Sequence, residues 1–393
     1  MSRACLWMTL SAALLLPGGC GLQQRGSAPV TPEAMADDLE PGSLRRAVAE
    51  SLRFLHEVPG ESRLGEWPRA VTAADLRGAL AEFLEILDRS VETDASWLDR
   101  VAERFDFHPA PARPTGTSVL FTGYYQPVID ASPVRTEEYR YPVYREPGAG
   151  GPPPGPPGGP APGAPPPRPG TEGSAAAYPS RHEIDVLGAL DGKGFEIAWL
   201  RDPVDRFFLH IQGSGLLRMT DGRELPLNFA ASNGRPYTSI GRVLIDEGKV
   251  DRESMSMQRI RAWLAEFPKE REALFARNER YIFFRLGEDG PLGSLGVPLT
   301  AGRSVATDPA VYPKGALLYV ETRTPVVDES GALAGWRPVR RFVVNQDAGA
   351  AIRGPGRADL YFGTGAAAGA QAGYMQSEGR LYLLMKRRSA PLG

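Results

Sequence analysis

Cysteine and histidine are scarce in this chain, which has two cysteines and four histidines among its 393 residues. The cysteines, Cys5 and Cys20, both lie near the start, so we expect no disulfide and no thiolate metal site in the rest of the chain. The histidines are scattered, and no two show the short spacing of a zinc site. The sequence therefore predicts neither a metal nor a cofactor.

An excess of charge of one sign is also lacking, because 45 Lys and Arg residues accompany 47 Asp and Glu residues. The formal net charge of -2 gives no indication of a nucleic-acid or other polyanionic partner. A neutral polymer such as a glycan fits this composition at least as well. We therefore expect no nucleic-acid partner.

The apolar run near the N-terminus covers only residues 4–16, which is short of the roughly 20 residues that span a bilayer. Arg3 precedes the run and small residues follow it, the pattern of a secretory signal peptide. Small residues directly before Cys20 are also what the bacterial lipoprotein-processing machinery accepts. We therefore expect residues 1–19 to be a signal peptide and Cys20 to carry lipid.

The tether that follows, residues 20–40, would lead away from the lipid. Acyl chains hold a protein to a membrane with about 0.8 kcal/mol per buried methylene, without a membrane-spanning helix. Gly21 stands where an aspartate would favour the inner membrane, so we expect the periplasmic face of the outer membrane. Pro17 replaces the leucine usual three places before the cysteine, and ordinary secretion with a buried free thiol is the alternative.

A Pro/Gly-rich segment at residues 148–177 interrupts the chain, with 11 of its 37 prolines between positions 152 and 169. Such a segment cannot form a strand ladder or a packed helix. Residues 141–144 before it and the patterns after it are typical of strands, so we interpret it as an insertion between two strands of one domain. An interdomain linker is the alternative.

The periodicity predicts helices first and short strands afterwards. Ser43 and Thr72 are expected to cap two helices with apolar residues at helical spacing, and residues 255–275 form a later helical stretch. The expected strands cover residues 195–200, 207–211, 216–219, 281–285, 317–321, 342–345 and 381–385. Many short strands separated by glycine-rich turns favour a barrel or a sandwich.

Two clusters of uncharged polar and aromatic residues lie at the ends of expected strands. In residues 121–127, a glycine lets the chain turn while Thr122 and Tyr124 are presented together; the aromatic ring can stack on a sugar or simply pack a barrel end. After the strand expected at 207–211, Gln212 and Ser214 offer donors and acceptors suited to hydroxyl and acetamido groups. Each of these residues could also be an ordinary turn residue.

Three aspartates lie in two further clusters, at residues 293–309 and 345–363. Asp308 precedes a proline and is by default a turn former. Asp347 and Asp359 stand at opposite ends of a glycine-rich connection. A carboxyl can act as a general acid if burial or a neighbouring carboxylate raises its pKa, but Arg353 and Arg357 could lower it instead. The residues alone leave open which effect prevails.

These motifs together resemble the membrane-bound lytic murein transglycosylase A family, with its three-aspartate domain, over most of residues 118–388 except the proline-rich insertion. The resemblance implies a mainly β fold with N-terminal helices: a double-psi β-barrel domain from residues 41–124 and 280–393, a smaller inserted β domain at 125–279, and a groove between them for glycan. Where the family has Gln-Asp-Thr-Gly-Gly, this chain has Ala348 and Ala350 after Asp347.

The resemblance also implies the chemistry. Asp359 would protonate the oxygen between N-acetylmuramic acid and N-acetylglucosamine, then accept the proton of the muramoyl 6-hydroxyl as it closes on C1, giving 1,6-anhydromuramic acid. Thr122, Tyr124, Gln212, Ser214, Asp308 and Asp347 are the expected substrate-binding residues.

The implied partners are the peptidoglycan glycan strand, a membrane through the lipid anchor, and cell-wall synthesis or division proteins. A hydrolase that uses water would need a second carboxylate, for which Asp347 or Asp308 would have to serve. A noncatalytic glycan-binding lipoprotein is the third possible function.

Overall fold

The computed structural model describes residues 28–89, 96–111, 116, 118–147, 178–287 and 290–387. The expected signal peptide, Cys20 and the insertion at 148–177 lie outside the described residues. Across the described ranges, none of the helices combines the length and the hydropathy needed to cross a membrane.

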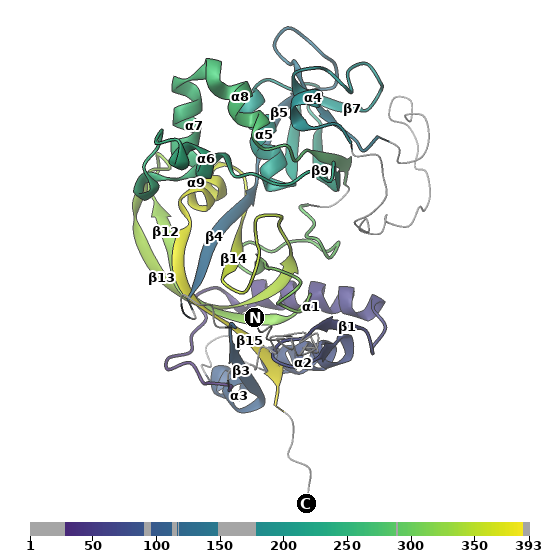
Figure 1. The fold of residues 1–393 in the computed structure, drawn as a ribbon. Coiled ribbons are helices and arrows are strands. Elements are labelled where there is room, and N and C mark those ends of the chain that lie inside the picture. The colour runs from purple at the N-terminus through teal and green to yellow at the C-terminus, as the bar shows by residue number, and fades with distance from the viewer. Residues whose placement is uncertain are drawn as a thin grey trace, which may run out of the picture.

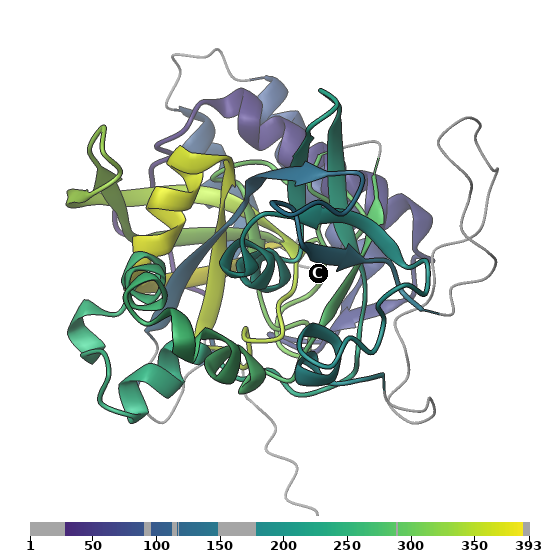
Figure 2. The same ribbon diagram turned by 90° about the horizontal axis from the view of Figure 1, so that it is seen from above.

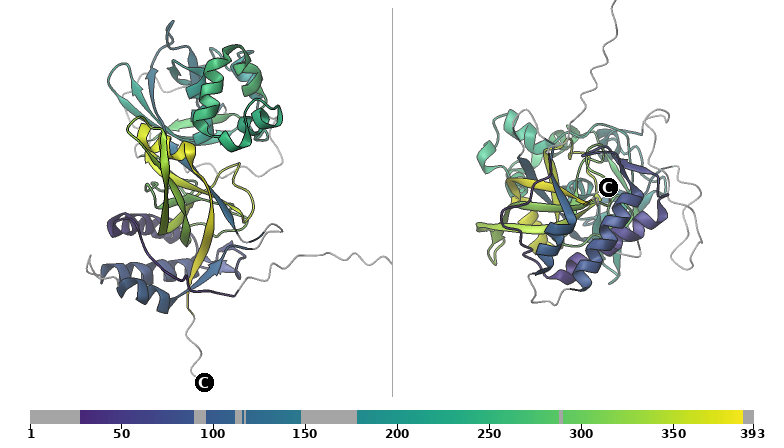
Figure 3. Two further views of the ribbon diagram at one scale, coloured as in Figure 1. Left: turned by 90° about the vertical axis from the view of Figure 1, so that its left-hand side faces the viewer. Right: turned by 90° about the horizontal axis from the view of Figure 1, so that it is seen from below.

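Three layers are stacked along the long direction of the molecule: N-terminal helices at one end, a β-barrel in the middle, and a second β-sheet flanked by helices at the other end (Figure 1; Figure 3, left). The strands of the barrel sheet are β3 (Phe105–Pro109), β4 (Val119–Gln126), β11 (Ser304–Ala306), β12 (Leu317–Val327), β13 (Leu333–Asp347), β14 (Arg357–Thr364) and β15 (Gln376–Lys386).

Six of these strands close into a barrel in the order β12-β13-β11-β14-β4-β15, because β15 also pairs with β12. The pairs β11–β13 and β14–β4 are parallel and the other pairs in the ring are antiparallel. Apolar side chains such as Phe121, Leu318 and Leu360 fill the interior and are at most 2% exposed. The barrel and its N-terminal helices confirm the fold class that the resemblance implied.

The N-terminal layer contains three helices and a two-stranded ribbon. Its elements are α1 (Pro41–Glu57), β1 (Arg63–Gly65), β2 (Val71–Thr72), α2 (Ala73–Asp88) and α3 (Ser96–Arg104). Thr72 caps α2 as predicted, through a capping box with Asp75. The prediction for Ser43 was wrong: α1 begins two residues earlier because Pro41 is preorganised for the first helical position, and the Ser43 hydroxyl donates to Glu40 O at 2.7 Å.

A buried arginine ties this layer to the barrel. Arg303, just before β11, is fully buried, and its guanidinium donates to both carboxylate oxygens of Asp37 at 2.7 Å. It also donates to the Ser43 hydroxyl and to the backbone oxygens of Glu40 and Phe342. All five N–H groups of the planar guanidinium can therefore be satisfied in this one contact.

The second sheet has the order β10-β9-β8-β5-β7-β6. Its strands are β5 (Val128–Ser132), β6 (Tyr141–Tyr144), β7 (Glu196–Leu200), β8 (Gly215–Met219), β9 (Glu224–Ser232) and β10 (Ile282–Leu286). Only Pro127 separates β4 of the barrel from β5 of this sheet. β10 lies beyond residue 279, where the inserted domain was expected to end, so the sheet extends further along the chain than the sequence indicated.

The strand expected at residues 207–211 is wrong, because this segment lies within a helix, α5 (Pro203–Gln212). Asp202 caps it by accepting from the backbone N–H of Val204 at 2.8 Å, Pro203 occupies the first helical position, and Gly213 ends it with φ 77°. Buried side chains recur at helical spacing along its face, at Val204, Phe207 and Phe208, and the partly buried Ile211 continues the pattern. Gln212 therefore leaves a helix end, not a strand.

The remaining helices surround the second sheet and connect it to the barrel. They are α4 (Arg181–Asp185), α6 (Ile240–Asp246), η1 (Arg252–Ser254), α7 (Met257–Glu266), η2 (Pro268–Glu270), α8 (Arg271–Ala276) and α9 (Ala366–Tyr374). Seen from above, α9 lies on the side of the barrel next to the green helices of the upper unit (Figure 2). The side chain of Gln258 on α7 donates to Ala370 O on α9 at 2.9 Å, which ties the two units together.

Candidate active site

Two of the three aspartates lie in one row across the outside of the barrel. Ala306 at the end of β11 pairs with Asp347 on β13 and with Asp359 on β14. Asp359 in turn pairs with Thr122 on β4. Because strands are about 4.8 Å apart, the Cα atoms of the two aspartates are separated by roughly 10 Å. Ala358 and Leu360 point into the core, so Asp359 points away from it.

Asp359 is the end of a hydrogen-bonded chain of three side chains. The Thr122 hydroxyl donates to Asp359 Oδ1 at 2.6 Å and accepts from Arg357 Nη2 at 3.1 Å. Arg357 is two residues before Asp359 on β14 and so lies on the same face. The hydroxyl of Thr122 thus connects the carboxyl to the guanidinium and fixes its orientation.

The pKa of Asp359 is raised to about 6, and burial is the largest cause. The Thr122 hydrogen bond and the charge of Arg357 oppose this effect, while the charge of Asp347 adds to it. The question that the sequence left open is thereby answered: burial outweighs the arginine. A carboxyl with such a pKa is substantially protonated in mildly acidic solution and can serve as a general acid.

Asp347 has a more constrained environment. Its Oδ1 accepts from the backbone N–H groups of Ser294 and Ala348, both at 2.8 Å. Burial raises its pKa above the ordinary value, and these hydrogen bonds work against the shift. Oδ1 of Asp347 is thus occupied by two backbone N–H groups. The negative charge of Asp347 favours the protonated form of Asp359.

Asp308 lies outside this row and holds a loop. Its two carboxylate oxygens accept from the backbone N–H of Ala310 at 3.0 Å and of Gly354 at 2.6 Å. It is only 6% exposed. These contacts orient the connection between β13 and β14, which carries Asp347 and Asp359 at its two ends.

Tyr124 points to the same face as Thr122, two residues further along β4. Burial raises its pKa well above the ordinary value, and the charges of Asp347 and Asp359 add to the shift, so the phenol stays neutral beside both carboxyls. Its ring packs against Tyr361, with centroids 5.2 Å apart. The turn that the sequence predicted at Gly123 is wrong. Gly123 lies inside β4, where a Cβ would collide with Phe362 and α9.

Gln212 and Ser214 lie at the junction of the two units. Gln212 Oε1 accepts from the backbone N–H of Tyr125 at 3.1 Å, which fixes the end of α5 against β4. Ser214 is 9% exposed and directly precedes β8. The amide oxygen of Gln212 is thus used within the protein, and its amino group remains the part suited to substrate.

Tyr237 is a residue that the sequence reasoning missed. Burial raises its pKa, and the negative charge of Asp359 contributes to the shift although a Ser239 hydrogen bond and Arg357 oppose it. Tyr237 follows β9 and therefore belongs to the second unit, whereas Asp359 belongs to the barrel. The sequence signal that could have indicated it is an aromatic residue within the polar stretch that follows Asn233. Groups from both units therefore surround the carboxyl of Asp359.

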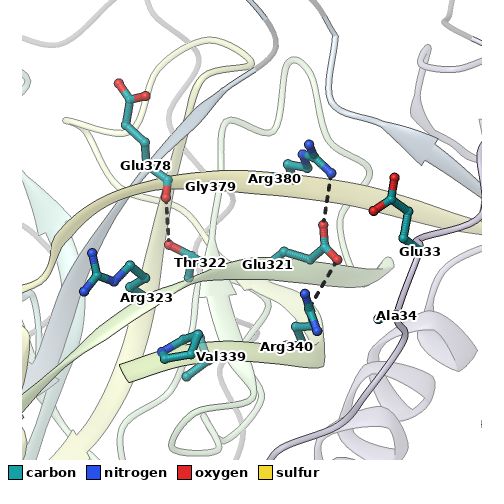
Figure 4. A pocket seen from close by; sticks show the side chains of 11 residues that line it. Glu33, Ala34, Glu321, Thr322, Arg323, Val339, Arg340, Glu378, Gly379 and Arg380 are labelled. Carbon is teal, nitrogen blue, oxygen red and sulfur yellow. Dashed lines mark hydrogen bonds and ion pairs between the residues drawn. The ribbon is translucent and has the colours of Figure 1, made fainter. Parts of the chain in front are cut away.

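A cavity of about 330 Å³ lies elsewhere on the barrel, between the segment at Glu33 and strands β12, β13 and β15 (Figure 4). Three of its charged groups are paired with one another: Glu321 lies 3.6 Å from Arg340 and 3.8 Å from Arg380. The side chain of Thr322 donates to Glu378 O (Figure 4). This cavity contains none of the three aspartates.

Sequence comparison identifies two regions. Residues 120–285 match the MltA specific insert domain, and residues 303–385 match the 3D domain. The membrane-bound lytic murein transglycosylase A of Escherichia coli strain K12 is 38% identical over 273 residues, which is 68% of this chain and 66% of the relative. The protein of the same name from Vibrio cholerae is 33% identical over 270 residues, 68% of this chain and 65% of that protein. The alignments thus span slightly under two thirds of these relatives.

Solved structures agree over a longer stretch. A membrane-bound lytic murein transglycosylase from Agrobacterium tumefaciens superposes with a TM-score of 0.72 and 31% identity, covering 92% of this chain and 97% of that one. E. coli MltA with bound chitohexaose gives a TM-score of 0.69 and 29% identity, with 93% and 95% covered. The chain belongs to the membrane-bound lytic murein transglycosylase A family.

Proposed function

We propose that this protein is a lytic transglycosylase that cleaves the β-1,4 bond between N-acetylmuramic acid and N-acetylglucosamine, with Asp359 as its catalytic acid. The observation that carries the proposal is the raised pKa of Asp359 within a fixed hydrogen-bonded setting. Within the row, the carboxyl of Asp359 has a pKa of about 6 and accepts a hydrogen bond from the hydroxyl of Thr122. The E. coli relative binds chitohexaose, a chain of the same kind of sugar.

The reaction needs one carboxyl in two protonation states. Protonated Asp359 donates its proton to the glycosidic oxygen as the bond from that oxygen to muramoyl C1 breaks. The muramoyl 6-hydroxyl then forms a bond to C1, and the Asp359 carboxylate accepts its proton. The carboxyl is thereby restored, the product is a 1,6-anhydromuramoyl end, and no water is consumed.

The surrounding residues position the strand and the acid. Thr122 orients Asp359, and neutral Tyr124 offers a ring beside both carboxyls. Asp347 keeps the protonated form of Asp359 populated. Gln212 and Ser214 contribute polar groups from the second unit, and Asp308 supports the connection that carries the acid.

The division of the chain follows the two sheets. We assign the barrel domain to residues 41–124 and to the segment after β10, and the inserted domain to residues from 125 through β10, which moves the second boundary from 279 to 286. The glycan strand would lie between these domains, where Tyr237 of the inserted domain approaches Asp359 of the barrel.

The test is Asp359→Asn, which keeps the size of the side chain and its ability to accept from Thr122 but removes the acid. Loss of a general acid lowers the rate by about 10²–10⁴-fold, so lysis of purified peptidoglycan should be nearly abolished while sedimentation with peptidoglycan persists. Asp88→Asn, at an exposed carboxyl of the N-terminal layer, is the matched control and should keep full lytic activity. Full lytic activity of Asp359→Asn would disprove the assignment.

The lipid anchor is a separate proposal: Cys20 carries lipid and holds the enzyme at the periplasmic face of the outer membrane. The sequence around Cys20 and the membrane-bound relatives support it. Fractionation tests it, because Cys20→Ser should move the protein from the outer-membrane fraction into the soluble periplasm. A Cys20→Ser protein that remains in the membrane fraction would contradict it.

A further inference from the structure

A second cavity, of about 150 Å³, opens on the inserted unit away from the row of aspartates. It lies between α4, α5, α8 and β6, in the upper part of the molecule (Figure 1). The cavity therefore has room for a small group as well as for water. None of the residues placed in the catalytic row lines it.

Two buried arginines at this cavity share a single carboxylate. Asp185 Oδ1 lies 2.9 Å from Arg206 Nη2, and Asp185 Oδ2 lies 3.4 Å from Arg181 Nη1. The side chains of the two arginines are 8% and 1% exposed. Two buried positive charges therefore accompany one negative charge. Such an imbalance is costly inside a protein unless a further anion is available.

The two arginines differ in how many of their donors are used. The guanidinium of Arg181 also donates to Asn278 O at 3.0 Å and Arg280 O at 2.6 Å, and it contacts His210 Nδ1 at 3.0 Å. For Arg206, Asp185 is the one acidic partner within the described residues, and its guanidinium packs on the Tyr141 ring. Arg206 therefore has N–H groups to offer a ligand in the cavity.

The rim adds further cationic and apolar groups. Arg271 uses Nε to donate to Leu264 O at 2.6 Å, which leaves its two terminal nitrogens to donate to a ligand. Glu272, also on the rim, is exposed and offsets one positive charge. The lining thus contains three arginines and two carboxylates, an excess of one positive charge. The other walls are mainly apolar side chains: Val186, Pro203, Pro268, Phe275 and Ala276. A ligand with one negative charge and a small apolar body matches this lining.

We propose that this cavity binds the terminal carboxylate of a peptide stem of peptidoglycan, with Arg206 and Arg271 as its main contacts. The inference rests on the proposed function only in the choice of ligand, since the short peptides on the glycan end in a carboxylate next to a small apolar side chain. A planar carboxylate can accept two parallel hydrogen bonds from a guanidinium, and one such charge balances the cavity.

The experiment is isothermal titration calorimetry of the full chain in detergent with N-acetyl-D-alanyl-D-alanine. The C-terminal amide of the same peptide is the matched ligand without the charge. Because hydrogen bonds to charged groups contribute strongly, we expect the amide, and the peptide titrated into Arg206→Gln, to bind roughly 10-fold or more weakly. Arg323→Gln, on the other cavity, should bind like the unmodified protein.

Two further variants separate the possible results. Arg271→Gln, at the partly exposed rim, tests the same site without touching the buried ion pairs and should also weaken binding. Asp359→Asn should bind the peptide normally, so a failure of the proposed catalysis and a failure of this site are distinguishable. Equal affinity for the acid and the amide, no effect of either arginine change, or equally tight binding of inorganic phosphate would overturn the proposal.

Discussion

The hydroxyl of Thr122 donates to the carboxyl of Asp359 and accepts from Arg357, so it bridges the acid and the nearest guanidinium. Its hydrogen bond favours the ionised carboxylate and therefore lowers the pKa of Asp359, against the larger effect of burial. The balance between these effects sets the pH range in which the acid is protonated.

Thr122→Val removes the hydrogen bond at nearly constant volume and should shift the pH dependence of kcat/KM. In the unmodified enzyme, kcat/KM should fall as the pH rises above about 6, because protonated Asp359 is lost. In the variant the pKa of Asp359 rises, so this decline should move to higher pH, while the maximal rate falls roughly 10-fold or more because the acid is no longer oriented. A decline at an unchanged pH would contradict the role given to Thr122.

The same raised pKa has a consequence for stability. Ionised Asp359 is less favourable in the folded protein than in the unfolded chain. The free energy of unfolding therefore falls as the pH rises from 3.8, the ordinary pKa of the group, through about 6. Asp359→Asn avoids this loss, and should be about 1–2 kcal/mol more stable than the unmodified protein near pH 7.5 and nearly equal near pH 4. Urea unfolding at the two pH values tests this, and a variant less stable near pH 7.5 would contradict it.

At the scale of single residues, the sequence identified Asp359 only through the family resemblance. Whether burial or arginine controls its pKa depends on side chains brought together by strand pairing between β4, β11, β13 and β14, which no local pattern reveals. Tyr237 was missed for the same reason, because it approaches Asp359 from another unit.

At the scale of elements, the predicted cap was correct at Thr72 and wrong at Ser43, and the strand predicted in an ambiguous apolar run was wrong. The capping box of α2 was readable at Thr72. In α5, alternation from Phe207 to Ile211 resembled a strand, whereas Asp202, Pro203 and Gly213 marked a helix. The two periods are hard to separate in a short apolar run, so end signals are the better guide.

The contact between the N-terminal segment and the barrel provides a stability prediction at this scale. Asp37→Ala leaves buried Arg303 without its carboxylate and removes an acceptor from Phe342 N, so the free energy of unfolding should fall by about 3–5 kcal/mol. Arg45→Ala, which removes the exposed pair with Asp88, is the control and should cost less than about 1 kcal/mol. Denaturant unfolding measures both, and equal losses would contradict the anchoring role of Arg303.

At the scale of the whole molecule, the sequence predicted many short strands but not how they join. The barrel closes through β12 and β15, which are far apart in the chain. The parallel pair β11–β13 and the antiparallel pair β11–β14 place Asp347 and Asp359 on either side of Ala306. This arrangement depends on long-range pairing, so only the resemblance supplied it in advance. It brings Asp347 to within two strands of Asp359, a spacing that a water-using glycosidase could also exploit.

The product decides between these mechanisms and tests the central claim most directly. Purified peptidoglycan is digested by the enzyme in isotopically labelled water, and the released muropeptides are analysed by mass spectrometry. Cleavage by internal cyclisation at Asp359 predicts muramoyl ends lighter by one water and free of the label. Muropeptides with full-mass reducing ends that carry the label would show that water is the nucleophile, and would contradict the account.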